Sequence, residues 1–229
     1  MKEYEHLSSL PAVAKLVAFC EEHQICVAPA LTEGELTDSR VFSRLPTVDE
    51  ISIGVDDALT RGECLNVEFK QTLFLNVRRL EKDPTFSASA AVDHEISHEV
   101  VKTINAFMNS GGGTLLIGVC DNGDCYGLEN EFPYLPGAKK DRDAWELFFW
   151  QTIENCLEEF GRFRSSITGT FVRRSERDIF AVIMKPIGAP ICVCKERGGQ
   201  EHVYVRSGNR SKKLKLREIV DLIRERMNP

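Results

Sequence analysis

The stretch "VVKTINAFMNSGGGTLLIGV", residues 100–119, decides the fold, because it predicts a helix, a glycine turn and a buried strand in succession. Apolar residues recur at helical spacing from Ile96 to Phe107, so we expect a helix from about Asp93 to Asn109. The glycines then end that helix. A phosphate-binding loop has the opposite order, because its glycines precede a helix whose free N–H groups face the anion. We therefore expect no ATP site at these glycines.

Working outward from this stretch, helix and strand patterns alternate along the chain. Strand patterns occupy residues 65–75, 166–174, 178–186, 190–196 and 201–207. A second long helix with an aromatic stripe covers residues 141–160, and an amphipathic helix covers residues 216–227. This order predicts an α+β fold in which a mixed β-sheet packs against several helices. We expect residues 47–229 to form one domain after an N-terminal helical and strand extension, residues 1–46, and residues 79–92 to form an exposed insertion.

The composition excludes several classes of protein. The chain has 229 residues, of which 42% are hydrophobic and 28% are charged, as in ordinary globular domains. It shows no secretory signal and no run of eighteen apolar residues, so we expect a cytoplasmic protein without a membrane partner. The net charge is −6, yet residues 195–229 carry ten Lys/Arg against five Asp/Glu, or +5, which leaves −11 for the rest. Such a basic segment on an acidic body suits a localised phosphate-contacting surface.

The segment "HEISH", His94–His98, matches the H-E-x-x-H motif of zinc proteases. Both histidines point away from the apolar stripe of their helix, so we expect them on its outer side. The only downstream histidine is His202, and no known extension of the motif follows. Cys192 and Cys194 alternate on a strand pattern, but no second Cys/His pair accompanies them. We therefore expect a polar first helical turn and no zinc site.

Three ordered blocks of sequence together resemble the Schlafen AlbA_2 family. They are "VEFKQTL" at residues 67–73, the glycine stretch extended to residue 128, and "VYVRSGNRSKKL" at residues 203–214. The blocks span most of residues 62–228. The resemblance implies a single Schlafen AlbA_2-like lobe that binds nucleic acid, either RNA or DNA.

The resemblance also implies a set of acidic residues. Schlafen nucleases of this family cut tRNA or rRNA with three acids, which fall here on Glu63, Glu68 and Asp121. Three such carboxylates would hold Mg²⁺ or Mn²⁺, and the ion would activate water and neutralise the phosphate. Lys70 shares a strand face with Glu68 and would steady the water or the phosphate. The alternative is that Glu68 and Lys70 form a simple ion pair, Asp121 serves the turn and Glu63 is a solvated loop acid.

The last block supplies the basic residues of the expected nucleic-acid interface. These are Arg206, Arg210, Lys212, Lys213 and Lys215. Cations on one loop can contact consecutive phosphates without reading sequence, and Arg206 is the one we expect to be paired with an acid instead. Three functions stay open: a divalent-metal-dependent RNA endonuclease, a non-catalytic DNA- or RNA-binding regulator, and a protein-interaction module that dimerises through helix 143–160. A homodimer would supply the second lobe that Schlafen nucleases carry in one chain.

Overall fold

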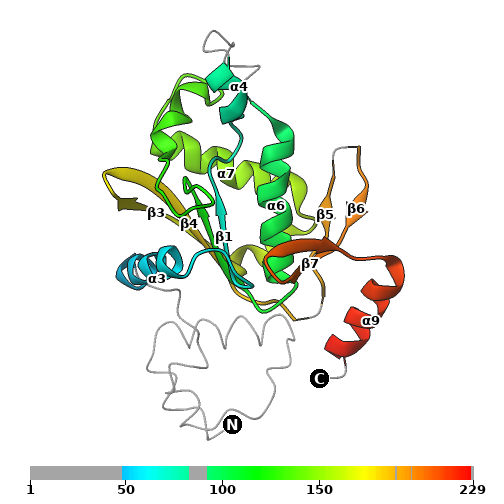
Figure 1. Ribbon diagram of the computed structural model, residues 1–229. Coiled ribbons are helices and arrows are strands. Elements are labelled where there is room, and N and C mark those ends of the chain that lie inside the picture. The colour runs from blue at the N-terminus through cyan, green and yellow to red at the C-terminus, as the bar shows by residue number, and fades with distance from the viewer. Residues whose placement is uncertain (1–47, 83–91, 189, 197, 228–229) are drawn as a thin grey trace, which may run out of the picture. The chain divides into compact units, whose positions relative to one another are not determined.

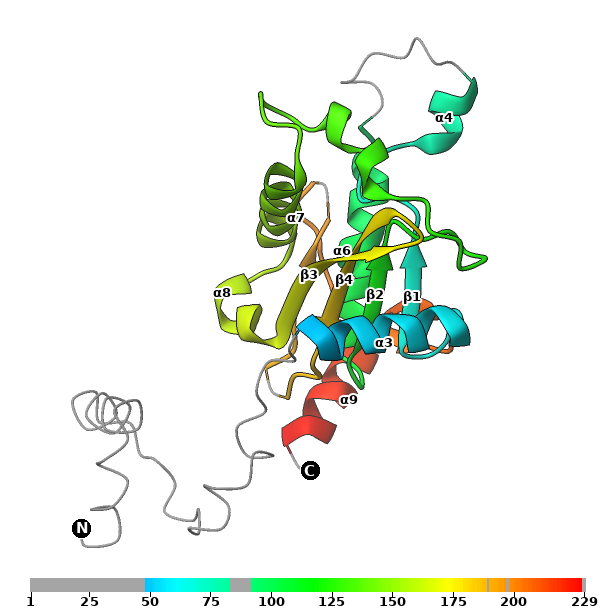
Figure 2. The same cartoon turned by 90° about the vertical axis from the view of Figure 1, so that its left-hand side faces the viewer.

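The computed structural model describes residues 48–82, 92–188, 190–196 and 198–227. The predicted N-terminal extension, residues 1–46, and most of the predicted insertion lie outside the described residues. Four strands form the main sheet of the described part, namely β1 (Val67–Lys70), β2 (Gly113–Ile117), β3 (Ile167–Arg174) and β4 (Arg177–Met184). The strand order is β1-β2-β4-β3, with β1 parallel to β2 and the other pairs antiparallel (Figure 1; all four strands are labelled in Figure 2). The predicted mixed sheet of an α+β fold is confirmed.

Helices cover both faces of this sheet (Figure 2). Helix α3 (Val48–Arg61) packs on the face that carries Phe69 and Leu116, whereas α6 (His94–Met108) and α7 (Arg142–Cys156) pack on the face that carries Leu115. Side chains alternate between the two faces of a strand, so both faces of β1 and β2 are buried. The smaller elements are α4 (Val77–Lys82), η3 (Leu128–Asn130), η4 (Phe132–Tyr134), α8 (Phe160–Phe163), η5 (Arg164–Ser166), β5 (Cys194–Lys195), β6 (Glu201–His202), β7 (Tyr204–Ser207), β8 (Arg210–Lys213) and α9 (Leu216–Met227). Among the described residues, no helix is both long enough and apolar enough to cross a membrane.

The glycine turn between α6 and β2 forms as the sequence predicts. Gly112 has φ +76°, a conformation that side chains rarely adopt, and its N–H donates to the carbonyl of Phe107 at 3.0 Å. A Cβ on Gly113 would come within 2.4 Å of the Phe107 ring. The glycines therefore let the chain reverse directly against the end of α6, where no side chain fits.

The predicted aromatic helix is shorter than expected. Helix α7 ends at Cys156, and Glu159 then takes a left-handed conformation with φ 51°, so the prediction of one helix to residue 160 is wrong. The aromatic stripe packs inward: Trp145 and Phe149 are fully buried, and both rings lie within 5.0 Å, centroid to centroid, of the Phe180 ring of β4. These two aromatic side chains are thus part of the core.

The predicted strand at residues 201–207 is divided between two small sheets. Its first half, β6, pairs with β5, and its second half, β7, pairs with β8. The break has a physical cause, because the N–H of Tyr204 donates to the side chain of Asn105 in α6, at 2.9 Å, instead of to a neighbouring strand. The β7–β8 hairpin is held against α6 in this way.

Candidate nucleic-acid interface

Glu68 lies in β1 on the face of the sheet that α6 covers, because its neighbours Val67 and Phe69 pack with α3 on the other face. Its Oε1 accepts a hydrogen bond from Lys70 Nζ at 2.6 Å. Its Oε2 lies 3.0 Å from Arg206 Nη2, without the angle of a hydrogen bond. Glu68 is only 9% exposed. Lys70 and Arg206 balance its charge where little water reaches it.

Arg206 is enclosed in the protein, and the expectation that it pairs with an acid is confirmed. Its side chain is 1% exposed. The guanidinium donates to the carbonyls of Leu65 and Cys64 at 3.2 and 3.0 Å and lies 4.7 Å from the centroid of the Phe107 ring. Arg206 thus ties β7 to the loop before β1, and in this arrangement it is not available to a phosphate.

The other two predicted acids occupy different surroundings. Glu63 accepts a hydrogen bond from the backbone N–H of Phe69 at 2.9 Å, at the free edge of β1. Asp121 is exposed in the turn that follows β2. That turn starts beside the end of β1, because the N–H groups of Gly118 and Val119 donate to the carbonyl of Lys70.

The three carboxylates do not fit a divalent cation as they are arranged. Within the ranges that the structure describes, no group of three or more His, Cys, Asp or Glu side chains is placed to hold a metal ion. Both oxygens of Glu68 face cations, and an oxygen of Glu63 accepts from the backbone. A site for Mg²⁺ or Mn²⁺ at Glu63, Glu68 and Asp121 stays a prediction.

The β7–β8 hairpin has one face toward the body and one face away from it. Tyr204 and Arg206 are buried, so their cross-strand partners Lys213 and Ser211 share the inner face. Arg210 and Lys212 therefore project from the outer face. Arg210 is exposed and makes no ion pair within the described part of the chain, whereas Lys212 Nζ lies 2.6 Å from Glu218.

The remaining cations of this region differ in their partners. Lys213 Nζ lies 2.7 Å from His202 Nε2 and 3.7 Å from Glu196 Oε1. Lys215 precedes α9, and its backbone N–H donates to Glu218 Oε2 at 2.8 Å, as in a capping box. The side chain of Lys215 is exposed and forms no ion pair in the described part of the protein, although its charge, after that of Lys212, helps to lower the pKa of Glu218.

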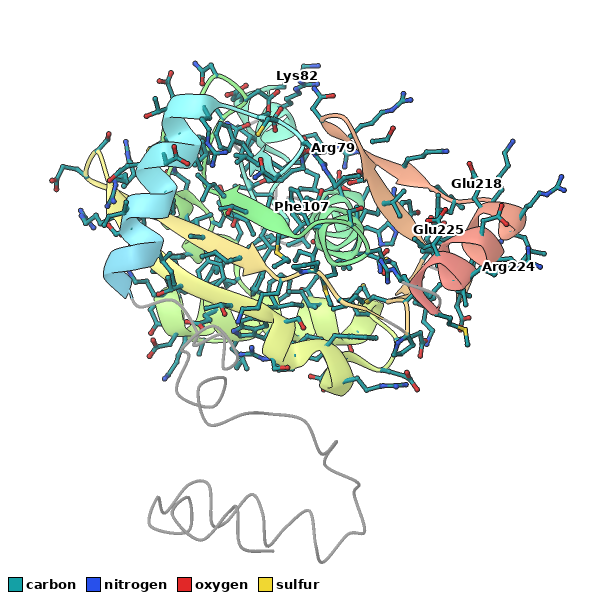
Figure 3. The ribbon with its side chains drawn as sticks, turned by 90° about the horizontal axis from the view of Figure 1, so that it is seen from below. Arg79, Lys82, Phe107, Glu218, Arg224 and Glu225 are labelled. Carbon is teal, nitrogen blue, oxygen red and sulfur yellow. The ribbon has the colours of Figure 1, made fainter. Side chains whose placement is uncertain are left out.

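Arg217, in the first turn of α9, is likewise exposed without an ion pair among the described residues, and the sequence analysis missed it. Its place in the basic segment 195–229 was the signal for it. Figure 3 shows Glu218 at this start of α9 and Phe107 in the interior. We call Arg210, Lys212, Lys215 and Arg217 the basic hairpin surface.

Only the first part of the H-E-x-x-H segment lies on an outer surface as expected. His94 is exposed, but the side chain of His98 is only 13% exposed, with its Nε2 3.9 Å from Glu196 Oε1. Burial, together with the nearby charge of Lys102, lowers the pKa of His98. The prediction for His98 is wrong because α6 is covered by β5 and α7 as well as by the sheet, and the apolar stripe alone does not reveal this.

The family whose description is "Schlafen, AlbA_2" matches residues 63–215. No curated protein matches the chain. Among solved structures, the chain is similar to the DIP2311 protein from Corynebacterium diphtheriae, with 14% sequence identity and a TM-score of 0.48. That similarity covers 78% of this chain but only 29% of the other protein. Because the family match spans well over half of the sequence, the chain belongs to the Schlafen AlbA_2 family and is a nucleic-acid-related, Schlafen-like protein.

Proposed function

We propose that this protein binds nucleic acid through the basic hairpin surface. The observation that carries the proposal is that Arg210, Lys215 and Arg217 are exposed and form no ion pair within the described residues. Between residues 203 and 217 the chain carries six Lys/Arg and no Asp/Glu. Free cations that lie close together can displace the counterions of a phosphate backbone, which favours binding.

The charge of the whole chain favours contact only where cations are concentrated. A net charge of −6 disfavours contact with nucleic acid over the protein as a whole, so binding needs a local group of cations such as that of the hairpin and the start of α9. Backbone contacts of this kind position the ligand and carry little sequence information. The proposal is therefore for binding of moderate affinity and low sequence preference, to RNA or to DNA.

The test compares two double variants that remove the same charge from different surfaces. Arg210→Ala/Lys215→Ala removes two unpaired cations of the basic hairpin surface. Arg61→Ala/Lys139→Ala removes two exposed cations elsewhere, one in α3 and one in the segment before α7. Fluorescence anisotropy with labelled RNA and DNA, titrated at several salt concentrations, measures affinity and its salt dependence for the wild type and both variants.

We expect the hairpin variant to bind more weakly and its salt slope to fall by about one for each phosphate contact removed. The matched control should keep the wild-type affinity and slope. Equal losses in both variants would mean that binding depends only on net charge. No measurable binding by the wild type to either RNA or DNA would overturn the proposal.

Cleavage of the bound strand is a separate prediction that rests on family resemblance. Asp121 is the most informative residue to test, because it is exposed and its side chain makes no hydrogen bond in the described part. Substitution of Glu68 would instead disturb the buried Arg206 pair. If the protein cuts tRNA in the presence of Mn²⁺, Asp121→Asn should lose cleavage while it keeps binding. Wild-type protein that binds but does not cut would leave the non-catalytic alternative.

A further inference from the structure

A hollow of about 570 Å³ lies between the first half of α6, the second half of α7 and β5. Its volume is in the range of sites that hold small molecules or single groups of larger ligands. The side chains that matter for its chemistry are His98, Lys102, Phe148, Asn155, Lys195 and Glu196. None of these residues belongs to the basic hairpin surface or to the three predicted acids, so we call this hollow the α6–α7 cavity.

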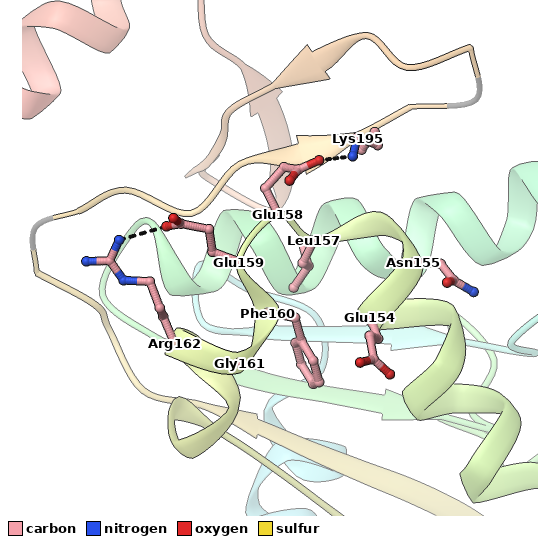
Figure 4. Close-up of a pocket in the computed structure, with 9 residues that line it drawn as sticks. All are labelled: Glu154, Asn155, Leu157, Glu158, Glu159, Phe160, Gly161, Arg162 and Lys195. Atoms are coloured by element: carbon pink, nitrogen blue, oxygen red, sulfur yellow. Dashed lines mark hydrogen bonds and ion pairs between the residues drawn. The ribbon is translucent and has the colours of Figure 1, made fainter.

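The lysines around the α6–α7 cavity are already paired with carboxylates. Lys102 Nζ lies 2.6 Å from Glu99, and Lys195 forms an ion pair with Glu158, as Figure 4 shows in the neighbouring hollow. The carboxylate of Glu196 faces His202 at 3.3 Å. Among the described lining residues, no lysine is left without a carboxylate partner to attract a phosphate, and the exposed acid Glu95 disfavours an anion. The cavity therefore suits a ligand group without net charge.

The cavity still offers groups that can form directed hydrogen bonds. His98 Nε2 is buried and has no hydrogen-bond partner among the described residues, which is uncommon in folded proteins. The lowered pKa of His98 keeps its ring neutral near pH 7, so the ring has one donor and one acceptor nitrogen. Asn155 is exposed on the same lining, and Phe148 adds apolar ring surface. This combination suits a flat, uncharged ring with hydrogen-bonding edges.

The cavity is joined directly to the basic hairpin. Glu196 Oε1 accepts a hydrogen bond from the hydroxyl of Tyr204 in β7 at 2.5 Å and lies 3.7 Å from Lys213 Nζ in β8. Lys213 is next in the chain to Lys212, which belongs to the basic hairpin surface, although the two side chains leave opposite faces of the hairpin. One residue of the cavity wall is therefore in contact with both strands of the hairpin.

We propose that the α6–α7 cavity takes one unstacked base of a single-stranded nucleic acid whose backbone lies on the basic hairpin surface. The inference rests on the proposed function and adds a substrate class to it, because a paired base in a duplex cannot enter such a cavity. Unpaired bases bind proteins through ring contacts and hydrogen bonds to their edges. RNA and DNA share this chemistry, so the assay includes both.

The test uses a cavity-filling variant and a matched control on the same helix. Asn155→Trp places a large ring in the cavity, whereas Gln151→Trp places it one helical turn earlier at an exposed position outside this lining. A third variant, His98→Phe, keeps a ring but removes both nitrogens. Each protein is titrated with single-stranded RNA, single-stranded DNA and a duplex of the same sequence. Oligonucleotides that contain 2-aminopurine report whether a base leaves its stack, because unstacking raises their fluorescence.

We expect the wild type to bind single strands more tightly than the duplex and to raise the 2-aminopurine fluorescence. Asn155→Trp should weaken single-strand binding at least about fivefold, the lower end of what one stacked base contributes. His98→Phe should weaken it by a smaller factor, and Gln151→Trp should match the wild type. Duplex binding should be the same in all four proteins.

Two outcomes separate this inference from the proposed function. Hairpin-dependent binding that is equal for single strands and duplex, or that Asn155→Trp leaves unchanged, overturns the cavity assignment and keeps the proposed function. Absence of any binding that depends on Arg210 and Lys215 overturns both. A preference for RNA over DNA in the single-strand arms would identify the ribose as part of what is recognised.

Discussion

Glu131 and Trp145 form a fully buried hydrogen bond in which the indole N–H donates to Glu131 Oε2 at 2.6 Å. The other oxygen, Oε1, accepts from the backbone N–H groups of Leu73, Phe74 and Leu75 at 2.8, 3.1 and 3.3 Å. One carboxylate thus connects α7 with the loop after β1. Because β1 ends at Lys70, these three N–H groups have no neighbouring strand to donate to, and the Glu131 carboxylate accepts their hydrogen bonds instead.

This carboxylate predicts a stability that falls as pH rises. Burial raises the pKa of Glu131 from 4.5 to about 7, and the indole and backbone donors offset only part of that effect. The folded state therefore binds the proton more tightly than the unfolded state, so the stabilisation is complete below pH 4.5 and is lost as pH rises to about 7. The change is on the order of 3 kcal/mol. Urea unfolding of the wild type and Glu131→Gln between pH 4 and pH 8 measures this change. If the free energy of unfolding of the variant depends on pH as steeply as that of the wild type, the assignment to Glu131 is contradicted.

Arg206→Met should strongly destabilise the protein. The substitution leaves the buried carboxylate of Glu68 with Lys70 alone and removes the donor from the carbonyls of Cys64 and Leu65. Removing one partner of a buried pair costs about 3–5 kcal/mol. Arg210→Met, on the exposed end of the same hairpin, should cost little. Adding Glu68→Leu to Arg206→Met should recover part of the loss in urea unfolding. If Arg206→Met and Arg210→Met have the same free energy of unfolding, the pair of Arg206 and Glu68 does not stabilise the fold.

Asn109→Ala should loosen the segment around Cys192 from α6, where Asn105 keeps one hydrogen bond to the Cys192 carbonyl. The Asn109 side chain accepts from the N–H of Cys192 at 2.9 Å and donates to its carbonyl at 2.8 Å and to that of Tyr204 at 3.2 Å. Each buried backbone group left without a partner costs about 1–3 kcal/mol. Faster hydrogen exchange at the amide of Cys192 should accompany the loss in stability. Asn155→Ala, at an exposed position of α7, serves as control and should change neither quantity.

Gly113→Ala and Gly111→Ala should differ although the two glycines are close in sequence. A Cβ at Gly113 would lie 2.4 Å from the Phe107 ring and 2.9 Å from the Asn66 carbonyl, whereas nothing lies within 4 Å of a Cβ at Gly111. Overpacking of this kind costs about 1–3 kcal/mol. Gly111 has no positive φ, so alanine there should be neutral or slightly stabilising. Urea midpoints of the two variants give the comparison, and equal midpoints would refute it.

The elements that the sequence predicted best depend on local patterns. Apolar spacing predicts helix α6 and β2, and the turn between them uses positions that only glycine can occupy. The division of residues 201–207 into two strands could not be predicted in this way. It depends on Asn105, whose side chain takes the N–H of Tyr204, and an Asn in a helix reads as an ordinary polar residue until its partner is known.

The same distinction between sequence and tertiary structure applies to the candidate site. Family resemblance identified Glu63, Glu68, Asp121 and the basic block by position, and the family match to residues 63–215 confirms that resemblance. The sequence predicted an acidic partner for Arg206, but only the tertiary structure decided that this partner is Glu68, that Arg210 and Lys215 form no ion pair among the described residues, and that His98 lines a cavity. The reason is physical. Helical and strand periodicity and turn formation depend on residues that are close in the chain, so the sequence alone determined these local elements. The burial, pairing or exposure of a charge depends on contacts between residues that are far apart in the chain, and only packing brings those residues together.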